Sequence, residues 1–259
     1  MRVDNNRVEK VDVLGLSIDT LSMEEILDAV EGSISSRKSL KIFYANAHVV
    51  LMAKRYPELG AHLRSADIIL PDGSGIVLAS RILGIPIRKR VIGLDVLLRL
   101  SETASKKGWR MYLLGAREEV LKRSVGILEK KFNGLKIIGY HHGYFSADEE
   151  QIIINDIAHK KPDIVVVCMG VGRQEKFIIK HSQFLNAPVF FGNGAAIDFI
   201  ARRLKRAPIW MQVCGLEWIY RFFQEPLRLW KRYTVGNLLF AAMILKEWIK
   251  RDSKKMTTG

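Results

Sequence analysis

Hydrophobic and polar positions follow two periods that alternate along the chain to about residue 200. Short apolar runs predict buried strands, and between them apolar residues recur at the three- and four-residue spacing of a helix with one buried face. Strands that alternate with helices through short links predict an α/β fold with a Rossmann-like, mostly parallel sheet flanked by helices. An opening strand or hairpin is expected at residues 11–18, and further strands at 41–45, 68–70, 110–114, 136–140, 163–169 and 189–191.

The stretch at residues 66–76 places a carboxylate where α/β proteins bind ligands. Asp72 follows a predicted strand and precedes Gly73 and Gly75, and a helical pattern begins near Ile76. Ligands of open α/β sheets bind at the carboxyl ends of the strands, so Asp72 is a candidate catalytic residue. Asp is also a frequent helix N-cap residue, and a role limited to capping remains open at this point.

Two later turns could also hold a ligand. Gly170 and Gly172 follow a continuous apolar strand and precede Gln174, but the third glycine of a dinucleotide-binding fingerprint is missing. Gly192 and Gly194 form a similar turn, which an ordinary strand-to-helix connection explains equally well. The chain has no Asp-x-Asp pair and no His/Cys cluster. We therefore expect no metal ion that holds a diphosphate.

Composition sets the carboxyl-terminal residues apart. The 259-residue chain has a formal net charge of +14, and residues 201–259 hold 13 Lys/Arg against 4 Asp/Glu, a net charge of +9. Four of the five Trp residues lie there, and the longest apolar run, at 238–245, is too short to span a bilayer. Basic residues mixed with Trp favour an anionic membrane surface, and nucleic acid is the other polyanion to consider. We expect a core at residues 1–205 and a basic, aromatic, helical membrane-binding appendage at residues 206–259, called the tail below.

Arginines in the tail are the next candidates for binding an anion. Pro226 should open a new helix. Arg221 and Arg228 are seven residues apart, which corresponds to about two helical turns, and Lys231 and Arg232 continue this row. The alternative is an ordinary pair of amphipathic helices docked on the core, with these cations in solvent.

The order of six short motifs indicates a family. The chain contains Pro71-Asp72-Gly73, Arg90-Val91-x-Gly93-x-Asp95, Gly170-x-Gly172-x-Gln174-Glu175, Arg206-Ala207-Pro208-x-Trp210, Gly215-Leu216-Glu217-Trp218-x-x-Arg221 and Glu225-Pro226-x-Arg228. In this combination the chain resembles the WecG/TagA/CpsF glycosyltransferases of bacterial cell-surface polymer synthesis. The resemblance runs from about Val11 to Tyr233.

The resemblance implies an activity and a place in the cell. It implies an inverting, metal-independent transfer of a sugar from a UDP-sugar to a polyprenyl-diphosphate-linked sugar, without a cofactor. Sugars moved in this family include N-acetylmannosamine, its uronic acid and glucose. The same resemblance implies a peripheral protein on the cytoplasmic face of the inner membrane that binds the anionic membrane surface and no nucleic acid. A homo-oligomer stays open.

Site residues are carried over by position. Asp72 resembles the proposed catalytic base of the family, and Arg90 and Gln174 resemble donor-site residues. Asp95 belongs to the same motif as Arg90 and is grouped with the substrate-binding residues. These residue types suit the chemistry, because a carboxylate can take the proton of an attacking hydroxyl and an arginine fork matches phosphate oxygens.

The remaining site residues lie at the two ends of the chain. Arg221 and Arg228 match tail arginines thought to close over the diphosphate. Asn46 matches the Asn of a Thr-Pro-Asn-like segment, which here reads Tyr44-Ala45-Asn46. The bulkier phenol of Tyr44 stands in the position of the Thr, so the identity of the donor sugar is left open.

Two other classes of function remain. A nicotinamide-dependent oxidoreductase would share the Rossmann-like sheet, but it should have a complete glycine fingerprint and an acidic residue for the ribose. A non-enzymatic basic protein on a membrane or on nucleic acid would explain the charge, but it would leave Asp72 without a role.

Overall fold

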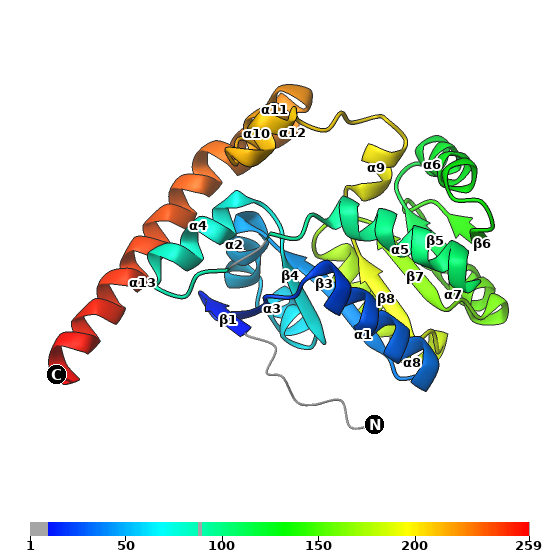
Figure 1. The fold of residues 1–259 in the computed structure, drawn as a ribbon, viewed down its shortest axis with the longest axis horizontal. Helices are drawn as coiled ribbons and strands as arrows, with labels where there is room; N and C mark the ends of the chain where they lie inside the picture. Colours follow the sequence, from blue (N-terminus) through cyan, green and yellow to red (C-terminus); the bar gives the residue numbers. More distant parts are fainter. Residues whose placement is uncertain (1–9, 88–89, 259) are drawn as a thin grey trace.

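A six-stranded, all-parallel sheet forms the centre of the protein. The computed structural model describes residues 10–87 and 90–258. The strand order is β4-β3-β8-β7-β5-β6, and a separate antiparallel hairpin is formed by β1 and β2 (Figure 1). The strands are β1 (Lys10–Val13), β2 (Leu16–Asp19), β3 (Leu40–Ala45), β4 (Ile68–Pro71), β5 (Arg110–Gly115), β6 (Lys136–His141), β7 (Ile164–Cys168) and β8 (Val189–Gly192). The predicted α/β class with a parallel sheet is confirmed, and a strand occurs at each of the predicted places along the chain.

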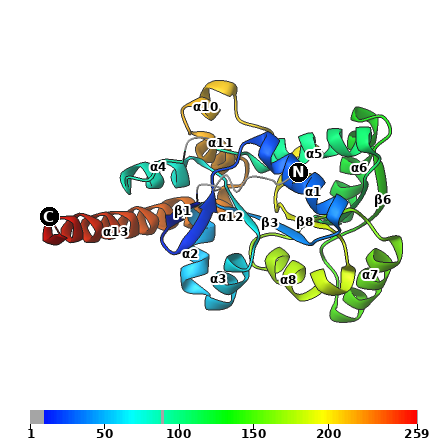
Figure 2. The same cartoon turned by 60° about the horizontal axis from the view of Figure 1, so that its bottom comes forward.

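Helices cover both faces of the sheet, because alternate residues of each strand point to opposite sides. On β3, for example, Phe43 packs in one apolar cluster and Tyr44 in the other. Figure 2 shows the sheet between the two layers. The first cluster is completed by α2 (Ala47–Arg55), α3 (Pro57–Arg64), α4 (Ser74–Ile82), α7 (Ala147–Lys160) and α8 (Arg173–Leu185). The second is completed by α1 (Met23–Ser36), α5 (Gly93–Lys107), α6 (Glu118–Lys131) and α9 (Ala196–Ile200).

The tail runs back across the core as a series of helices. They are α10 (Ile209–Val213), α11 (Glu217–Gln224), α12 (Pro226–Lys231), a π-helix η1 (Arg232–Gly236) and α13 (Asn237–Thr258). Phe240 and Ile244 of α13 are buried in the same apolar cluster as α2 and α4, whereas the carboxyl-terminal part of α13 extends beyond the core (Figure 1). No helix within the described residues is long and apolar enough to cross a membrane.

One expectation about the tail is wrong. Arg221 and Arg228 do not lie in a row on one helix, because Glu225 ends α11 and Pro226 begins α12. Proline has no N–H for the preceding helix, and its fixed φ suits the first turn of the next one. The prediction that Pro226 opens a helix is confirmed by the same break.

The tail is joined to the core beside the strand ends. The Ser74 hydroxyl, at the start of α4, donates a hydrogen bond of 2.8 Å to the carbonyl of Gly215. Gly215 has a φ of +73°, and a Cβ there would lie 2.8 Å from the Cβ of Ser74. Only glycine permits both the turn and this close approach. The tail is therefore fixed next to Asp72.

Candidate active site

Asp72 lies at the carboxyl end of β4 and does not cap the helix that follows. Its backbone N–H donates to the carbonyl of Ala45 at the end of β3, at 2.8 Å. The N-cap residue of α4 is Gly73, with a φ of +90°, and no side chain caps that helix. The interpretation of Asp72 as a helix cap is therefore wrong, and its carboxylate is left for other partners.

Asn46 and Arg232 lie beside this carboxylate. Asn46 caps α2, since its Oδ1 accepts a hydrogen bond of 3.1 Å from the N–H of Val49. The same oxygen accepts from Nη2 of Arg232 at 3.4 Å, and the Nε of Arg232 is buried without a partner among the described residues. Sequence analysis left Arg232 out of the site. Its only sequence signal was its place in the basic run that starts at Arg228.

Opposing effects determine the pKa of the Asp72 carboxyl. Burial raises the pKa of its carboxyl above the ordinary value, and the charge of Glu217 acts in the same direction. Arg90, Arg232 and a hydrogen bond with Asn46 lower that pKa, but they do not outweigh burial. A carboxylate with a raised pKa is a stronger base than a solvated one, which suits proton abstraction near neutral pH.

His48 is a second residue that sequence analysis did not single out. It lies in the first turn of α2, two residues after Asn46, and burial together with Arg232 and Arg228 lowers its pKa to about 4. The imidazole is therefore neutral at pH 7, and it can donate or accept a hydrogen bond there without adding charge.

Arg90 and Asp95 are both held by residues of the tail. Arg90 forms an ion pair with Glu217 at the start of α11. Asp95, in the first turn of α5, accepts two hydrogen bonds from the guanidinium of Arg206, at 2.7 and 2.8 Å. The structure thus places Arg90 near Asp72, whereas Asp95 already has a cationic partner.

Gln174 lies after β7, which is separated from β4 by β3 and β8 in the sheet. Its Nε2 donates to Oε1 of the buried Glu175 at 2.8 Å, while Oε2 of Glu175 accepts from the N–H of Gly172 at 2.5 Å. Oε1 of Gln174 has no partner among the residues described. Glu175 therefore holds the side-chain amide of Gln174, whose carbonyl oxygen accepts no hydrogen bond among the described residues.

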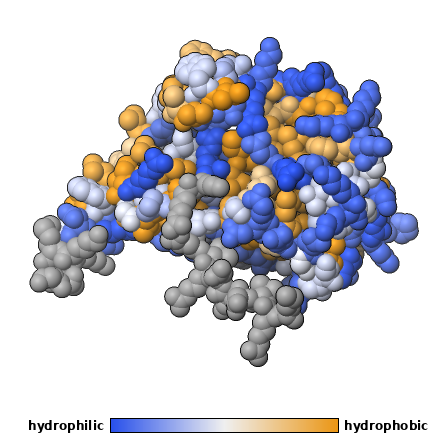
Figure 3. All heavy atoms as spheres, viewed as in Figure 1, coloured by the Kyte–Doolittle hydropathy of each residue, from blue (hydrophilic) through white to orange (hydrophobic). Residues whose placement is uncertain are grey.

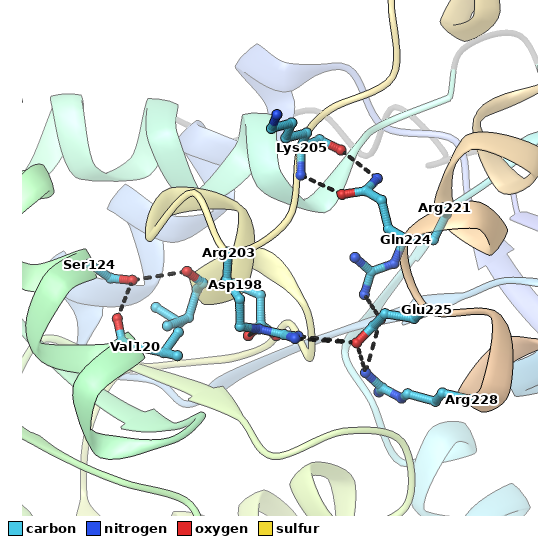
Figure 4. Close-up of polar contacts among 10 residues, drawn as sticks. Val120, Ser124, Asp198, Arg203, Lys205, Arg221, Gln224, Glu225 and Arg228 are labelled. Atoms are coloured by element: carbon cyan, nitrogen blue, oxygen red, sulfur yellow. Dashed lines mark hydrogen bonds and ion pairs between the residues drawn. The ribbon is translucent and has the colours of Figure 1, made fainter.

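Three arginines surround one carboxylate at the junction of α11 and α12 (Figure 4). Glu225 pairs with Arg221 at 2.7 Å, Arg228 at 3.2 Å and Arg203 at 3.3 Å. Arg203 also pairs with Asp198 at 2.6 Å. The cluster carries an excess of positive charge.

Arg221 and Arg228 are thus brought together by Glu225 rather than by a shared helix face. Nη1 of Arg221 is buried without a hydrogen-bond partner among the described residues. The charge of Arg228 is one of the causes that lower the pKa of His48. Unused guanidinium donors are suited to phosphate oxygens.

The arrangement combines a base with cationic groups at one edge of the sheet. A hydroxyl group could lose its proton to Asp72 while Arg90, Arg232 and the arginines around Glu225 stabilise negative charge on a leaving group. No group of three or more His, Cys, Asp or Glu residues that could hold a metal ion occurs in the part of the chain that the structure describes.

Comparison with known proteins defines the class of this protein as a glycosyltransferase. The model of the WecG/TagA/CpsF glycosyl transferase family matches residues 11–254, and the chain belongs to that family. A Bacillus subtilis strain 168 relative is 37% identical over 185 residues, which are 71% of each chain. A Bacillus spizizenii strain W23 relative is 34% identical over 199 residues, 77% of this chain and 76% of the relative.

A relative from Staphylococcus aureus strain MW2 covers more of the chain. It is 26% identical over 250 residues, which are 96% of this chain and 98% of the relative. All three relatives are named N-acetylglucosaminyldiphosphoundecaprenol N-acetyl-beta-D-mannosaminyltransferase. The oxidoreductase and the non-enzymatic alternatives are excluded by this family membership.

Proposed function

We propose that this protein transfers N-acetylmannosamine, or a related hexose, from a UDP-sugar to a polyprenyl-diphosphate-linked N-acetylglucosamine. The names of the relatives supply the sugar and the acceptor. The observation that carries the proposal is that the carboxylate of Asp72 lies at a strand end, does not cap α4, and has Arg90 and Arg232 near it.

The reaction is a direct displacement with inversion. A hydroxyl of the acceptor sugar attacks the anomeric carbon and gives its proton to Asp72. The bond between that carbon and the diphosphate oxygen breaks, and UDP leaves with the electron pair. Arg90, Arg232 and the arginines at Glu225 supply hydrogen bonds to the developing charge, so the mechanism needs no metal ion.

Binding of the donor must change three ion pairs of the tail. Arg90 is paired with Glu217, and Arg221 and Arg228 share Glu225. A diphosphate would compete with these carboxylates for the guanidinium groups. The ion pairs hold the arginines near their working positions before the substrate arrives, which lowers the cost of ordering them.

The tail is also the proposed contact with an anionic membrane surface. Its outer side exposes large apolar side chains, among them Leu227 at 93% and Val213 at 81% exposure. Figure 3 shows apolar residues along this outer edge, over α10 to α13. Apolar side chains beside basic ones favour peripheral binding to anionic lipid, and we propose the cytoplasmic face as the location.

A product assay tests the reaction. Purified protein is incubated with UDP-N-acetylmannosamine and a short-chain prenyl-diphosphate N-acetylglucosamine, and the product is analysed by mass spectrometry and NMR. We expect a disaccharide lipid whose new linkage has the opposite anomeric configuration to the donor. Turnover only with another UDP-hexose would identify the related hexose, whereas retention of configuration, or no turnover with any UDP-hexose, would contradict the proposal.

The same assay in excess EDTA tests metal independence. Activity should persist, because the arginines named above replace the cation that other transferases use on the diphosphate. Loss of turnover on chelation, with recovery in Mg²⁺ or Mn²⁺, would instead make Asp72 or Asp95 a candidate metal ligand.

A further inference from the structure

Tyr44 carries a buried hydroxyl that nothing in the described protein satisfies. The residue lies near the carboxyl end of β3, is 7% exposed, and packs edge-on against Phe191 with 5.6 Å between ring centroids. Its hydroxyl oxygen is closed to solvent and has no hydrogen-bond partner among the described residues. A buried polar group without a partner costs about 1–3 kcal/mol, so it calls for an explanation.

A second buried tyrosine shows the usual situation. Tyr112, on β5, is 1% exposed, and its hydroxyl donates a partly buried hydrogen bond to Oδ2 of Asp156 at 2.9 Å. The fold can therefore provide a partner for a buried phenol. Tyr44 differs from Tyr112 in its place in the molecule, because it lies at the strand ends where the active site is.

The surroundings of Tyr44 connect it to the site. Ala45, the next residue, accepts the hydrogen bond from the N–H of Asp72, and Asn46 follows. Burial first, and then the charges of Asp72 and Asp95, raise the pKa of Tyr44. The two carboxylates thus face the phenol from the neighbouring strand end and from the first turn of α5.

These surroundings determine what the hydroxyl can bind. Because it stays protonated, it offers an O–H donor to an uncharged acceptor. The charges of Asp72 and Asp95 both act against a negative group beside the phenol, so a carboxylate on the substrate is a poorer partner here than an uncharged acceptor. A carbonyl oxygen is the acceptor of suitable strength that an N-acetylated sugar brings.

We infer that Tyr44 is a specificity-determining residue whose hydroxyl donates a hydrogen bond to the acetamido carbonyl oxygen of the donor sugar. The acetamido group is on the carbon next to the one attacked, and so it lies close to the base. The inference rests on the proposed function. Since the hydroxyl is closed to solvent, the sugar reaches it only by displacing a covering group as it binds.

The test compares Tyr44→Phe with Tyr112→Phe, two substitutions that each remove one buried hydroxyl. Binding of UDP, UDP-N-acetylmannosamine and UDP-mannose is measured by calorimetry without acceptor, and Tm is measured for each variant. Tyr44→Phe should bind UDP-N-acetylmannosamine about three- to tenfold more weakly, the usual worth of one neutral hydrogen bond. Its affinity for UDP and UDP-mannose should be unchanged, and its Tm should not fall.

Tyr112→Phe should show the reverse pattern, with a lower Tm and unchanged binding, because its hydroxyl has a partner within the protein. The inference is overturned if Tyr44→Phe binds UDP-N-acetylmannosamine as the wild type does, or weakens UDP equally. Steady-state kinetics of the same variants add one more check: an effect found only in KM for the acceptor would also overturn the inference, since the N-acetyl group of the acceptor would then be the ligand. A wild type that binds UDP-mannose but not UDP-N-acetylmannosamine also overturns the inference, and one that binds none of the three nucleotides rejects the proposed function as well.

Discussion

The fold buries the carboxylate of Asp72, which costs folding free energy, and places two arginines near it. Its neighbours Arg90 and Arg232 reduce that cost but do not remove it, so its pKa stays above the ordinary value. A group placed in this way destabilises the folded state when it is ionised, and such a cost is common where a side chain serves catalysis.

Replacing Asp72 with Asn should separate rate from stability. We expect turnover to fall roughly 10²–10⁴-fold, the usual contribution of a positioned general base. Asp148→Asn is the control, because that side chain is exposed in the first turn of α7, after β6, which is the edge strand opposite β4. A variant of Asp72 that kept the wild-type rate would remove the base from the mechanism.

The same variant makes a prediction about pH. A raised pKa in the folded state means that the stability contributed by Asp72 is present below its unfolded pKa and is lost as the pH rises through its folded pKa. At neutral pH the ionised wild type lacks this contribution. Asp72→Asn should therefore have a higher Tm than the wild type at pH 7, and the difference should shrink in acid. A lower Tm at pH 7 would show that the ion pairs outweigh burial.

The π-helix η1 is the element that brings the tail into the site. Its first residue, Arg232, reaches Asn46, whereas Lys231 immediately before it ends α12 on the exposed side. π-helical turns are rare and often occur at functional sites. Because adjacent side chains of a helix point about 100° apart, Arg232 can face the site while Lys231 faces solvent.

Arg232→Ala should lower turnover by roughly 10²-fold, the order expected when one charge-stabilising donor is removed. It should also raise the pKa of His48 from about 4, since Arg232 is one of the causes that lower it. Lys231→Ala is the matched control and should change neither quantity. An NMR titration of the His48 ring, together with steady-state kinetics, checks both effects. An unchanged pKa of His48 would mean that Arg232 does not lie near His48 in solution.

At the scale of the whole molecule, the tail and the core build the site together. Four contacts join them around the strand ends: Ser74 with Gly215, Arg90 with Glu217, Asp95 with Arg206, and Asn46 with Arg232. The surface of the tail that faces away from these contacts carries the exposed apolar residues. Lipid binding and completion of the site would therefore involve opposite sides of the same segment.

Binding to anionic vesicles should depend on the apolar side chains of the tail. Phe223→Ser with Leu227→Ser should reduce co-sedimentation with phosphatidylglycerol-containing liposomes, because both side chains are mostly exposed and would insert at the headgroup level. Ile152→Ser with Leu78→Ser is the control, since these side chains are similarly exposed on α7 and α4. Equal losses in the two pairs would mean that the tail is not the binding surface.

The arrangement of elements was predictable because it is local. Apolar runs, the helical spacing of apolar residues and the glycines after strands are short-range patterns, and they fixed the type of each element. Boundaries differ by a residue or two, as at β4, which pairs as far as Pro71. The position of Asp72 at a strand end followed from the same local signals.

What the sequence alone determined is the parallel α/β class, the strand-end carboxylate and the family motifs, because all of these depend on residues close together in the chain. Only the tertiary structure decided that Asp72 does not cap α4, that Arg232 lies beside Asn46, and that the hydroxyl of Tyr44 has no partner. Each of these depends on the docking of the tail or on strand ends that lie side by side. That docking is driven by the burial of apolar residues such as Phe240, more than a hundred positions away from the core residues it joins.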